Sequence, residues 1–164
     1  MSTQYSSIRI HPSGMQFAVD DGLTVIGVVA LVAIAGYDGF TPKWMIPYII
    51  GVAIVLTLYL VYHYLYITRL VYVVTSEQLK YEYGIFSCQK DFVELYRVVD
   101  YSEQRSFLQL LLGIKTISIY SGDRTRPRLD LIGIENNLDL ISIIRERVEV
   151  NKKRHNIHEF TNTK

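Results

Sequence analysis

The sequence predicts a transmembrane helical hairpin followed by a mainly-β barrel of about seven short strands, capped by one C-terminal amphipathic helix. Apolar residues concentrate between Leu23 and Ile67, where charged residues are scarce. The pattern then alternates with a period of two, which is typical of half-buried strands. Near Leu138 it changes to the helical period. These changes of pattern define the fold class.

Composition limits the classes of function. The length of 164 residues suits one domain plus a membrane anchor, and 49% of the residues are hydrophobic. The net charge is +1, so bulk electrostatics favour no nucleic-acid partner. The lone cysteine, Cys88, excludes an intramolecular disulfide and a cysteine-based metal site. We expect Cys88 to be a small strand residue, because a reactive thiol needs a positive, partly exposed setting.

Residues 45–67 form the clearer of the two predicted spans. This segment contains no Asp, Glu, Lys or Arg and is long enough to cross the bilayer core of about 30 Å. Pro47 falls in its first turn, where the missing N–H costs little. Tyrosine and tryptophan favour the membrane interface, and they flank this span as Trp44 and Tyr48 at one end and Tyr62, Tyr64 and Tyr66 at the other.

Residues 23–40 form the other predicted span, which is marginal in length. Asp20 and Asp21 precede it and suit the N-terminus of a helix. The alternative is a signal peptide, because Ala33 and Ala35 precede Gly36 as at a cleavage site. The acidic residues before the apolar run disfavour that alternative, since a signal peptide carries positive charge there.

The two spans are expected to pack as a tight hairpin, because the link at residues 36–43 is short. Small residues let membrane helices approach closely. Each span carries such a face: Gly27, Ala30 and Ala33 on the first, and Gly51 and Ala53 on the second.

Charge predicts the orientation of the hairpin. Arg9 precedes the first span, and Arg69 and Lys80 follow the second, whereas Lys43 at the tip is balanced by Asp38. Positive charge favours the cytoplasm, so a multi-pass protein with both termini cytoplasmic is predicted.

His63 lies near the end of the second span. A polar side chain deep in a membrane is a functional candidate. Because tyrosines surround it in the sequence, we favour an ordinary side chain that reaches the interface.

The domain after the spans reads as a series of strands. Residues 79–86 alternate cleanly, with Lys80 and Glu82 on one face. The other face carries Leu79, Tyr81, Tyr83 and Ile85. Turn residues separate the segments at TSEQ and at SGDRTRP. Strands are predicted at residues 70–75, 79–86, 92–95, 98–103, 114–120 and 128–132.

Between two of these strands, residues 107–112 read as a short amphipathic helix. Gly113 then lets the chain reverse where a side chain would clash. We predict a structural corner that buries its leucines and has no catalytic role.

A C-terminal helix carries one apolar stripe, with Asn136 as its predicted N-cap and Asp139 as the acidic capping partner. The stripe consists of Leu138, Ile141, Ile144 and Val148. The predicted organisation is a cytoplasmic N-terminal segment (1–22), the hairpin (23–67), the β domain (68–150) and a polar tail expected to be disordered (151–164).

The segments YVVTSEQLKYEYGIF and ELYRVVDYSEQRSFLQLLLGIKTISIYSGD, followed by LDLIGI and a helix, resemble the bacterial PH-like (membrane-flanked) domain family, type 2. The resemblance covers nearly the whole chain, spans included. It implies a PH-like split barrel capped by a helix, a location in the bacterial inner (cytoplasmic) membrane, and no established enzyme activity.

The sequence lacks the common catalytic motifs. It has no glycine-rich phosphate loop, no HExxH and no GxSxG. His155 and His158 are three residues apart, but in a polar tail that is unsuited to hold a metal alone. We therefore expect no enzyme activity, no cofactor, no metal and no small-molecule substrate.

Two basic segments are candidate contacts for anions or lipid. Arg124, Arg126 and Arg128 alternate in DRTRPR, so an extended backbone would place them on one side. Arginine suits phosphate through its fork of donors. A solvated loop tip is the alternative, since acidic residues lie nearby. Anionic lipid, or only solvent, would contact the second segment, Lys152, Lys153 and Arg154.

The leading hypothesis is a non-enzymatic, membrane-anchored interaction or scaffolding module that binds a partner protein, or a second copy of itself, at the cytoplasmic membrane face. One alternative is an anionic-lipid or envelope-stress sensor that uses Arg124, Arg126 and Arg128. Another is a small subunit of a membrane transport or secretion complex, held through the small-residue faces.

Overall fold

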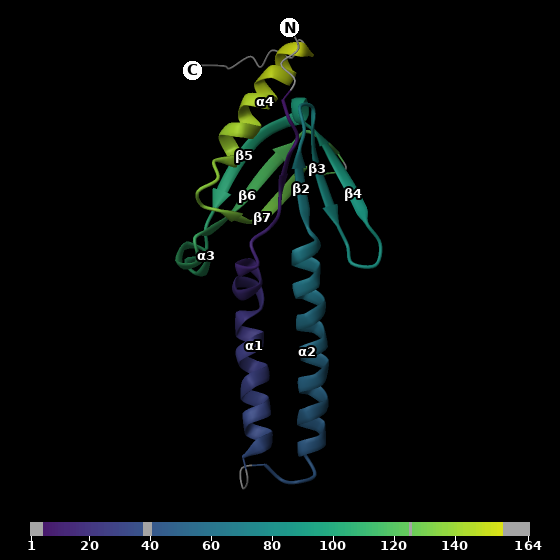
Figure 1. The fold of residues 1–164 in the computed structure, drawn as a ribbon, viewed down its shortest axis with the longest axis vertical. Helices are drawn as coiled ribbons and strands as arrows, with labels where there is room; N and C mark the ends of the chain where they lie inside the picture. The colour runs from purple at the N-terminus through teal and green to yellow at the C-terminus, as the bar shows by residue number, and fades with distance from the viewer. Residues whose placement is uncertain (1–4, 38–40, 125, 156–164) are drawn as a thin grey trace.

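The computed structural model describes residues 5–37, 41–124 and 126–155. Within them lie two long apolar helices, two antiparallel sheets, a short helix and a C-terminal helix (Figure 1). The helices and strands are β1 (Ile8–Ile10), α1 (Met15–Gly36), α2 (Ile46–Arg69), β2 (Val71–Val74), β3 (Gln78–Tyr83), β4 (Gln89–Glu94), the 3₁₀ turn η1 (Leu95–Arg97), β5 (Val98–Gln104), α3 (Phe107–Leu112), β6 (Ile114–Ser121), β7 (Arg128–Glu135) and α4 (Leu140–Arg154).

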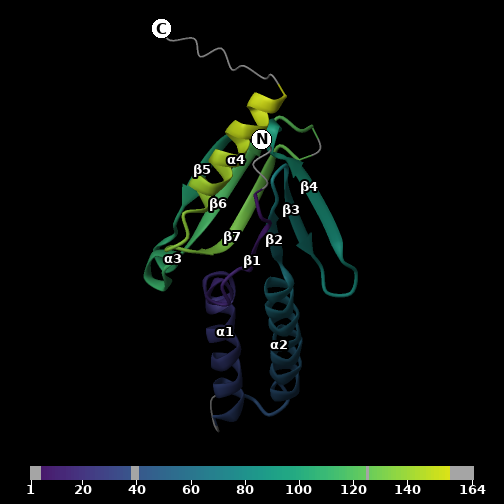
Figure 2. The ribbon, with the colours of Figure 1, turned by 45° about the horizontal axis from the view of Figure 1, so that its top comes forward.

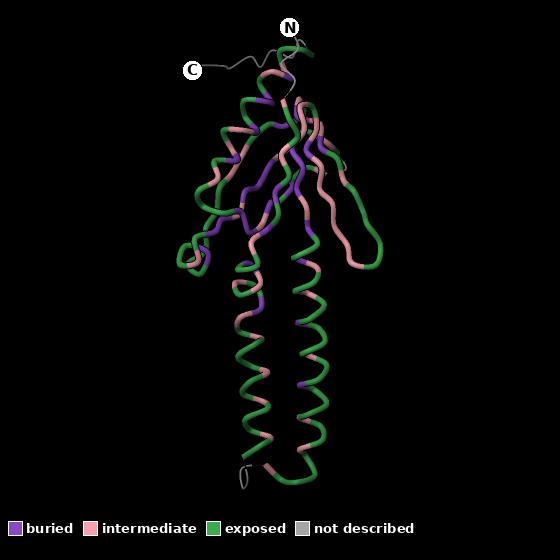
Figure 3. The backbone as a smooth tube through the Cα atoms, viewed as in Figure 1, coloured by how far each residue is buried: buried purple, intermediate pink, exposed green. Residues whose placement is uncertain are grey.

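The two sheets enclose one hydrophobic core. Their strand orders are β1-β2-β3-β4 and β5-β6-β7, and α4 covers the opening between them (Figure 2). Tyr72 joins the two sheets, because its hydroxyl accepts a hydrogen bond of 3.0 Å from the backbone N–H of Ile132. Burial raises the pKa of this phenol, which therefore stays neutral. The buried residues gather in this part of the molecule (Figure 3).

The helical hairpin interrupts the β domain instead of preceding it. β1 pairs antiparallel with β2, so the strands before and after the spans are neighbours, with Ile8 opposite Val74 and Ile10 opposite Tyr72. The predicted division at residues 1–22 and 68–150 separates these strands and is wrong on this point. A strand of three residues is too short for its alternation to be recognised in the sequence.

α1 begins at Met15, earlier than the predicted start at Leu23. Nothing after Gly14 breaks the helix, so Asp20 and Asp21 lie within it and do not precede it. α2 runs close to its predicted bounds. The end of the first predicted span, including Asp38, lies outside the described residues.

The spans contact each other through a different face from the one predicted. The more buried positions on α1 are Asp21, Thr24, Val28, Leu31 and Ala35, and those on α2 include Ala53, Leu60 and Ile67. This spacing of three and four residues is typical of a helix pair. The predicted small-residue face is exposed on the other side of α1, and on α2 only Ala53 of the predicted pair is buried: Gly27, Ala30, Ala33 and Gly51 point away from the contact.

The structure confirms α3 and its glycine stop but not the burial of its leucines. A capping box between Ser106 and Gln109 begins the helix, and Gly113 ends it with φ of 69°. Gln109 is the buried residue of this helix. The apolar side chains around it are exposed, because α3 lies at the rim of the barrel (Figure 1).

α4 begins later and ends later than predicted. Asp139 is the N-cap, with its carboxylate accepting hydrogen bonds from the N–H and hydroxyl of Ser142, so the predicted cap Asn136 is wrong. The helix continues into the predicted tail, because buried Asn151 donates to the carbonyl of Ser76 at 2.6 Å. Residues 156–164, including His158, lie outside the described residues.

The β3–β4 turn also differs from prediction. β3 ends at Tyr83, so the predicted strand 79–86 is too long and Ile85 lies in the turn. β4 starts at Gln89, which lies opposite Tyr83, and the predicted strand 92–95 loses Leu95 to η1. Cys88 is therefore an exposed turn residue and not a strand residue. Gly84 makes the turn possible with φ of 116°, since a Cβ there would lie 1.9 Å from the carbonyl oxygen of Ser87.

Candidate functional site

The predicted arginine site lies in the β6–β7 loop, at the end of the domain remote from the spans (Figure 2). Arg126 reaches Asp91 of β4 at 2.5 Å and Tyr83 at 3.5 Å. Arg128 donates to Asp130 at 2.7 Å on its own strand. Of these three arginines, Arg124 alone forms no ion pair with a residue that the structure describes. The structure therefore does not gather the three arginines into one site, and their anion contact stays a prediction.

The second predicted group, Lys152, Lys153 and Arg154, forms the last turn of α4. Positive charge at a helix C-terminus stabilises the helix without any ligand, because the free carbonyls there carry partial negative charge. Arg154 also lies 3.8 Å from Glu77. This turn is likewise at the end remote from the spans (Figure 1). Neither basic group faces a bilayer that the hairpin would cross.

Another polar group, not predicted, lies where the hairpin meets the domain. We call it the junction cluster: Gln16, Asp20 and Asp21 of α1, His63 of α2 and Gln109 of α3. Its central contact is a hydrogen bond between His63 Nδ1 and Asp21 Oδ2, which joins the two spans.

The Asp21–His63 pair is largely withdrawn from solvent. The side chain of Asp21 is 5% exposed and that of His63 is 26% exposed. Each residue lies about 9 Å along its helix from the end that adjoins the domain. The rings of Tyr59 and Tyr66 stack on the imidazole at 5.9 and 6.3 Å. A carboxylate from the other span therefore holds His63, a partner that was not predicted, and its position at the interface stays a prediction.

The rest of the cluster attaches α1 to the β domain. Gln16 donates to Asp20 at 2.8 Å and accepts from Gln109 at 3.1 Å. Gln109 also donates to Thr116 of β6 at 2.8 Å. Just before α1, the N–H of Ser13 donates to the carbonyl of Gly133 of β7 at 2.8 Å. The first span is thus bonded to both α3 and the second sheet.

The linkers that join the β domain to the two spans are short. Residues 11–14 separate β1 from α1, and only Leu70, which is fully buried, separates α2 from β2. The hairpin therefore has a defined orientation relative to the sheets. Any change in packing between the spans would act directly on the β1–β2 pair.

The central groups of the junction cluster bond to each other. The Asp21 carboxylate and the His63 imidazole satisfy each other between tyrosine rings. Within the part of the chain that the structure describes, no group of three or more His, Cys, Asp or Glu side chains is arranged to hold a metal ion. The arrangement fits a structural link between helices.

The family of the chain follows from its sequence pattern combined with this architecture. A family model described as "Bacterial PH domain" matches residues 22–148. The chain belongs to the bacterial PH domain family. Comparisons with curated proteins and with solved structures find no match. The matched residues of this bacterial PH domain include most of both long helices, so the hairpin is part of the family pattern.

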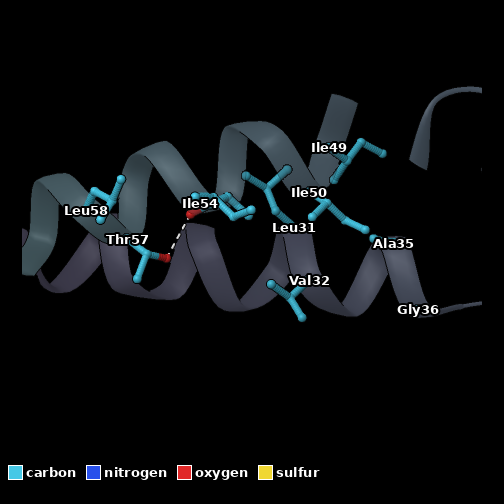
Figure 4. A pocket seen from close by; sticks show the side chains of 10 residues that line it. Leu31, Val32, Ala35, Gly36, Ile49, Ile50, Ile54, Thr57 and Leu58 are labelled. Carbon is cyan, nitrogen blue, oxygen red and sulfur yellow. Dashed lines mark hydrogen bonds between the residues drawn. The ribbon is translucent and has the colours of Figure 1, made fainter. Parts of the chain in front are cut away.

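The grooves on the described surface of the bacterial PH domain chain include one beside β1 and one between the spans. One, of about 410 Å³, lies beside β1 and is lined by Ile8–Ile10, His11, Glu135, Asn137 and Leu138. The other, of about 550 Å³, lies between the spans in the half nearer the link (Figure 4). Its lining is almost entirely apolar: Leu31, Val32, Ala35, Gly36, Ile49, Ile50, Ala53, Ile54, Thr57 and Leu58.

Proposed function

We propose that the chain is an integral membrane protein that holds a non-enzymatic PH-domain interaction module at the cytoplasmic face of a bacterial membrane. The observation that carries this proposal is the exposure of the two long helices. In each, only 6% of the most apolar window is buried against the rest of the protein. Exposed apolar surface costs about 25 cal/mol per Å² in water, which favours a lipid environment for these helices.

The groove beside β1 supports a protein partner. β1 is the edge strand of the first sheet, and its outer side faces this groove. A strand edge binds extended peptide through backbone hydrogen bonds, while adjoining pockets take alternate side chains. An extended segment of a partner protein is the occupant that suits this site. Arg9 and Glu135 on opposite sides would select its charge pattern.

The membrane arrangement is tested by cysteine labelling in a Cys88→Ser background. Lys43→Cys lies in the link between the spans, and Lys153→Cys lies at the far end of the domain. A membrane-impermeant maleimide should label Lys43→Cys in intact spheroplasts and Lys153→Cys only after lysis. The reverse pattern would invert the orientation, and equal labelling before lysis would exclude a membrane crossing.

The partner site is tested by photocross-linking from the full-length protein in its native membrane. A photoreactive residue at Asn137 lies in the β1 groove, and the matched control at Glu149 lies on the exposed side of α4. We expect a discrete protein adduct from position 137 and none from position 149. Equal adducts from both positions, or none from either, would contradict a partner at this groove.

A second candidate function, a small subunit of a larger membrane assembly, is favoured by the apolar groove between the spans and the outward small-residue face. A transmembrane helix of another protein would pack there through close backbone contact. Replacing both Gly27 and Ala30 by Leu should abolish such an assembly, whereas Val29→Leu should not. An assembly of unchanged mass in gentle detergent would refute this candidate.

A further inference from the structure

Exposed apolar side chains occur outside the spans as well. On α3, four of the six residues form what we call the α3 patch: Phe107 (79% exposed), Leu108 (45%), Leu110 (60%) and Leu111 (74%). Phe86, in the β3–β4 turn, is 94% exposed. Contiguous exposed apolar patches mark contact sites. We propose that the α3 patch and the Phe86 turn both insert into the surface of the bilayer that the hairpin crosses.

The position of α3 carries the first half of this proposal. The hydrogen bond from Gln109 to Gln16 holds α3 beside the first turn of α1, and Figure 1 shows the two at the same level. α1 has 22 residues and is about 33 Å long, slightly longer than the bilayer core of about 30 Å, so a hairpin that spans the core places the first turn of α1 at its boundary. α3, beside that turn, therefore lies at the depth of the headgroups. On the side of α3 that faces the protein, Gln109 donates hydrogen bonds to Gln16 and Thr116. The α3 patch covers the exposed side.

The caps of α3 fix where this short helix begins and ends. Ser106 and Gln109 satisfy the first turn, and Gly113 ends the helix in the left-handed conformation. The helix does not depend on membrane contact for its backbone bonds. An interfacial helix of this kind buries its apolar face about 5–10 Å into the boundary between headgroups and acyl chains.

The Phe86 turn lies on the other side of the hairpin. Figure 1 shows the β3–β4 hairpin extending down beside α2 to the level of its last turns. A groove of about 220 Å³ separates the turn from α2 and is lined by Tyr62, Tyr66, Tyr83 and Phe86 among others. Tyrosines at the end of a span mark the membrane interface. Phe86 is therefore at the level of this aromatic belt.

Both apolar surfaces lie at the end of the domain that adjoins the spans, one on each side of the hairpin (Figure 1). The basic residues of the β6–β7 loop and of the last turn of α4 lie at the opposite end. With the hairpin, the α3 patch and the Phe86 turn make three points of membrane contact, which would stop the domain from tilting. The groove beside β1 would then keep a constant orientation toward the cytoplasm.

This inference rests on the proposed membrane crossing, and its test separates the two. The full-length protein is placed in vesicles of phosphatidylcholine and phosphatidylglycerol, with some lipids carrying a nitroxide just below the headgroup. An environment-sensitive fluorophore is attached to natural Cys88, next to the Phe86 turn, or to Leu111→Cys in a Cys88→Ser background. Lys153→Cys is the remote control, and Leu23→Cys, which is 85% exposed on α1, reports the span.

We expect quenching at positions 23, 88 and 111 to be several-fold greater than at 153. Quenching at 23 alone would overturn the inference and leave the membrane crossing intact. Quenching at only one of positions 88 and 111 would also overturn it, because the proposal requires both contacts. No quenching at 23 would refute the membrane crossing itself. Phe107→Ser should lower the quenching at 111 without changing that at 23.

Discussion

α3 and α4 both carry apolar side chains, but these side chains have opposite surroundings. On α4, Leu140 and Ile144 are fully buried and Val148 is 4% exposed. On α3, Phe107 and Leu111 are more than 70% exposed. α4 lies across the opening between two sheets, whereas α3 lies at the rim beside the hairpin (Figure 1). An apolar face identifies which side of a helix avoids water, and the fold decides whether that side packs against the rest of the protein or stays exposed.

The largest effect expected from this contrast is on folding stability. Ile144→Ala should lower the free energy of unfolding by about 2–5 kcal/mol, because it leaves a cavity in the core. Leu111→Ala, the matched change on α3, should change it by less than about 0.5 kcal/mol in detergent. Pulse proteolysis of the full-length protein measures both values. Equal losses would mean that α3 also packs against protein.

A smaller effect is expected from the polar anchor of α4. Arg147 is 3% exposed and donates to the backbone carbonyls of Val74 and Thr75 at 2.7 and 3.0 Å. It also donates to Ser6 at 3.0 Å, next to β1. Arg147→Met should cost about 1–3 kcal/mol, because these carbonyls lose their partner in the interior.

The matched control for this variant is Arg145→Met on the exposed side of α4. Arg145 lies over the ring of Tyr101 at 5.8 Å, a contact worth about 0.5–1 kcal/mol at an exposed site. Urea unfolding followed by circular dichroism compares the two variants. A larger loss for Arg145→Met would show that the buried guanidinium does not anchor the helix.

A substitution at the C-terminus of α3 should lower the free energy of unfolding by still less. Gly113→Ala should cost about 1–2 kcal/mol, since a residue with a Cβ is strained at φ of 69°. No atom lies within 4 Å of the added carbon, so the cost is conformational and not steric. Gly113→Asn should cost less, because Asn tolerates this conformation better. An equal cost for both variants, measured by thermal unfolding, would contradict this explanation.

The smallest effect expected is the pH dependence of the α4 cap. Hydrogen bonds from Ser142 hold the pKa of the Asp139 carboxyl below its ordinary value of 3.8. Because the folded-state pKa is the lower one, the carboxylate adds stability above pH 3.8, and this is lost as the pH falls through the folded-state pKa. The stability difference between the protein and Asp139→Asn should therefore shrink on acidification. A difference that grows below that pH would have the wrong sign.

The sequence by itself determined the local features of this protein. The uncharged run of residues 45–67 predicted α2 nearly to its bounds, and the alternation of residues 79–83 predicted β3. Gly113 marked the end of α3, and the stripe through Ile144 marked the buried face of α4. The quoted motifs also identified the family, which is confirmed. These features follow from the period of side chains along one element, which neighbouring residues fix.

The tertiary structure decided whatever depends on segments far apart in the chain. Asp21 and His63 meet across 42 residues, and Gln16 and Gln109 across 93. The same holds for β1, whose three residues become a strand only because β2 returns beside them after the spans. Topology also paired Arg126 with Asp91 and left the α3 patch at the rim. No local pattern encodes such contacts, because the folded chain brings their partners together.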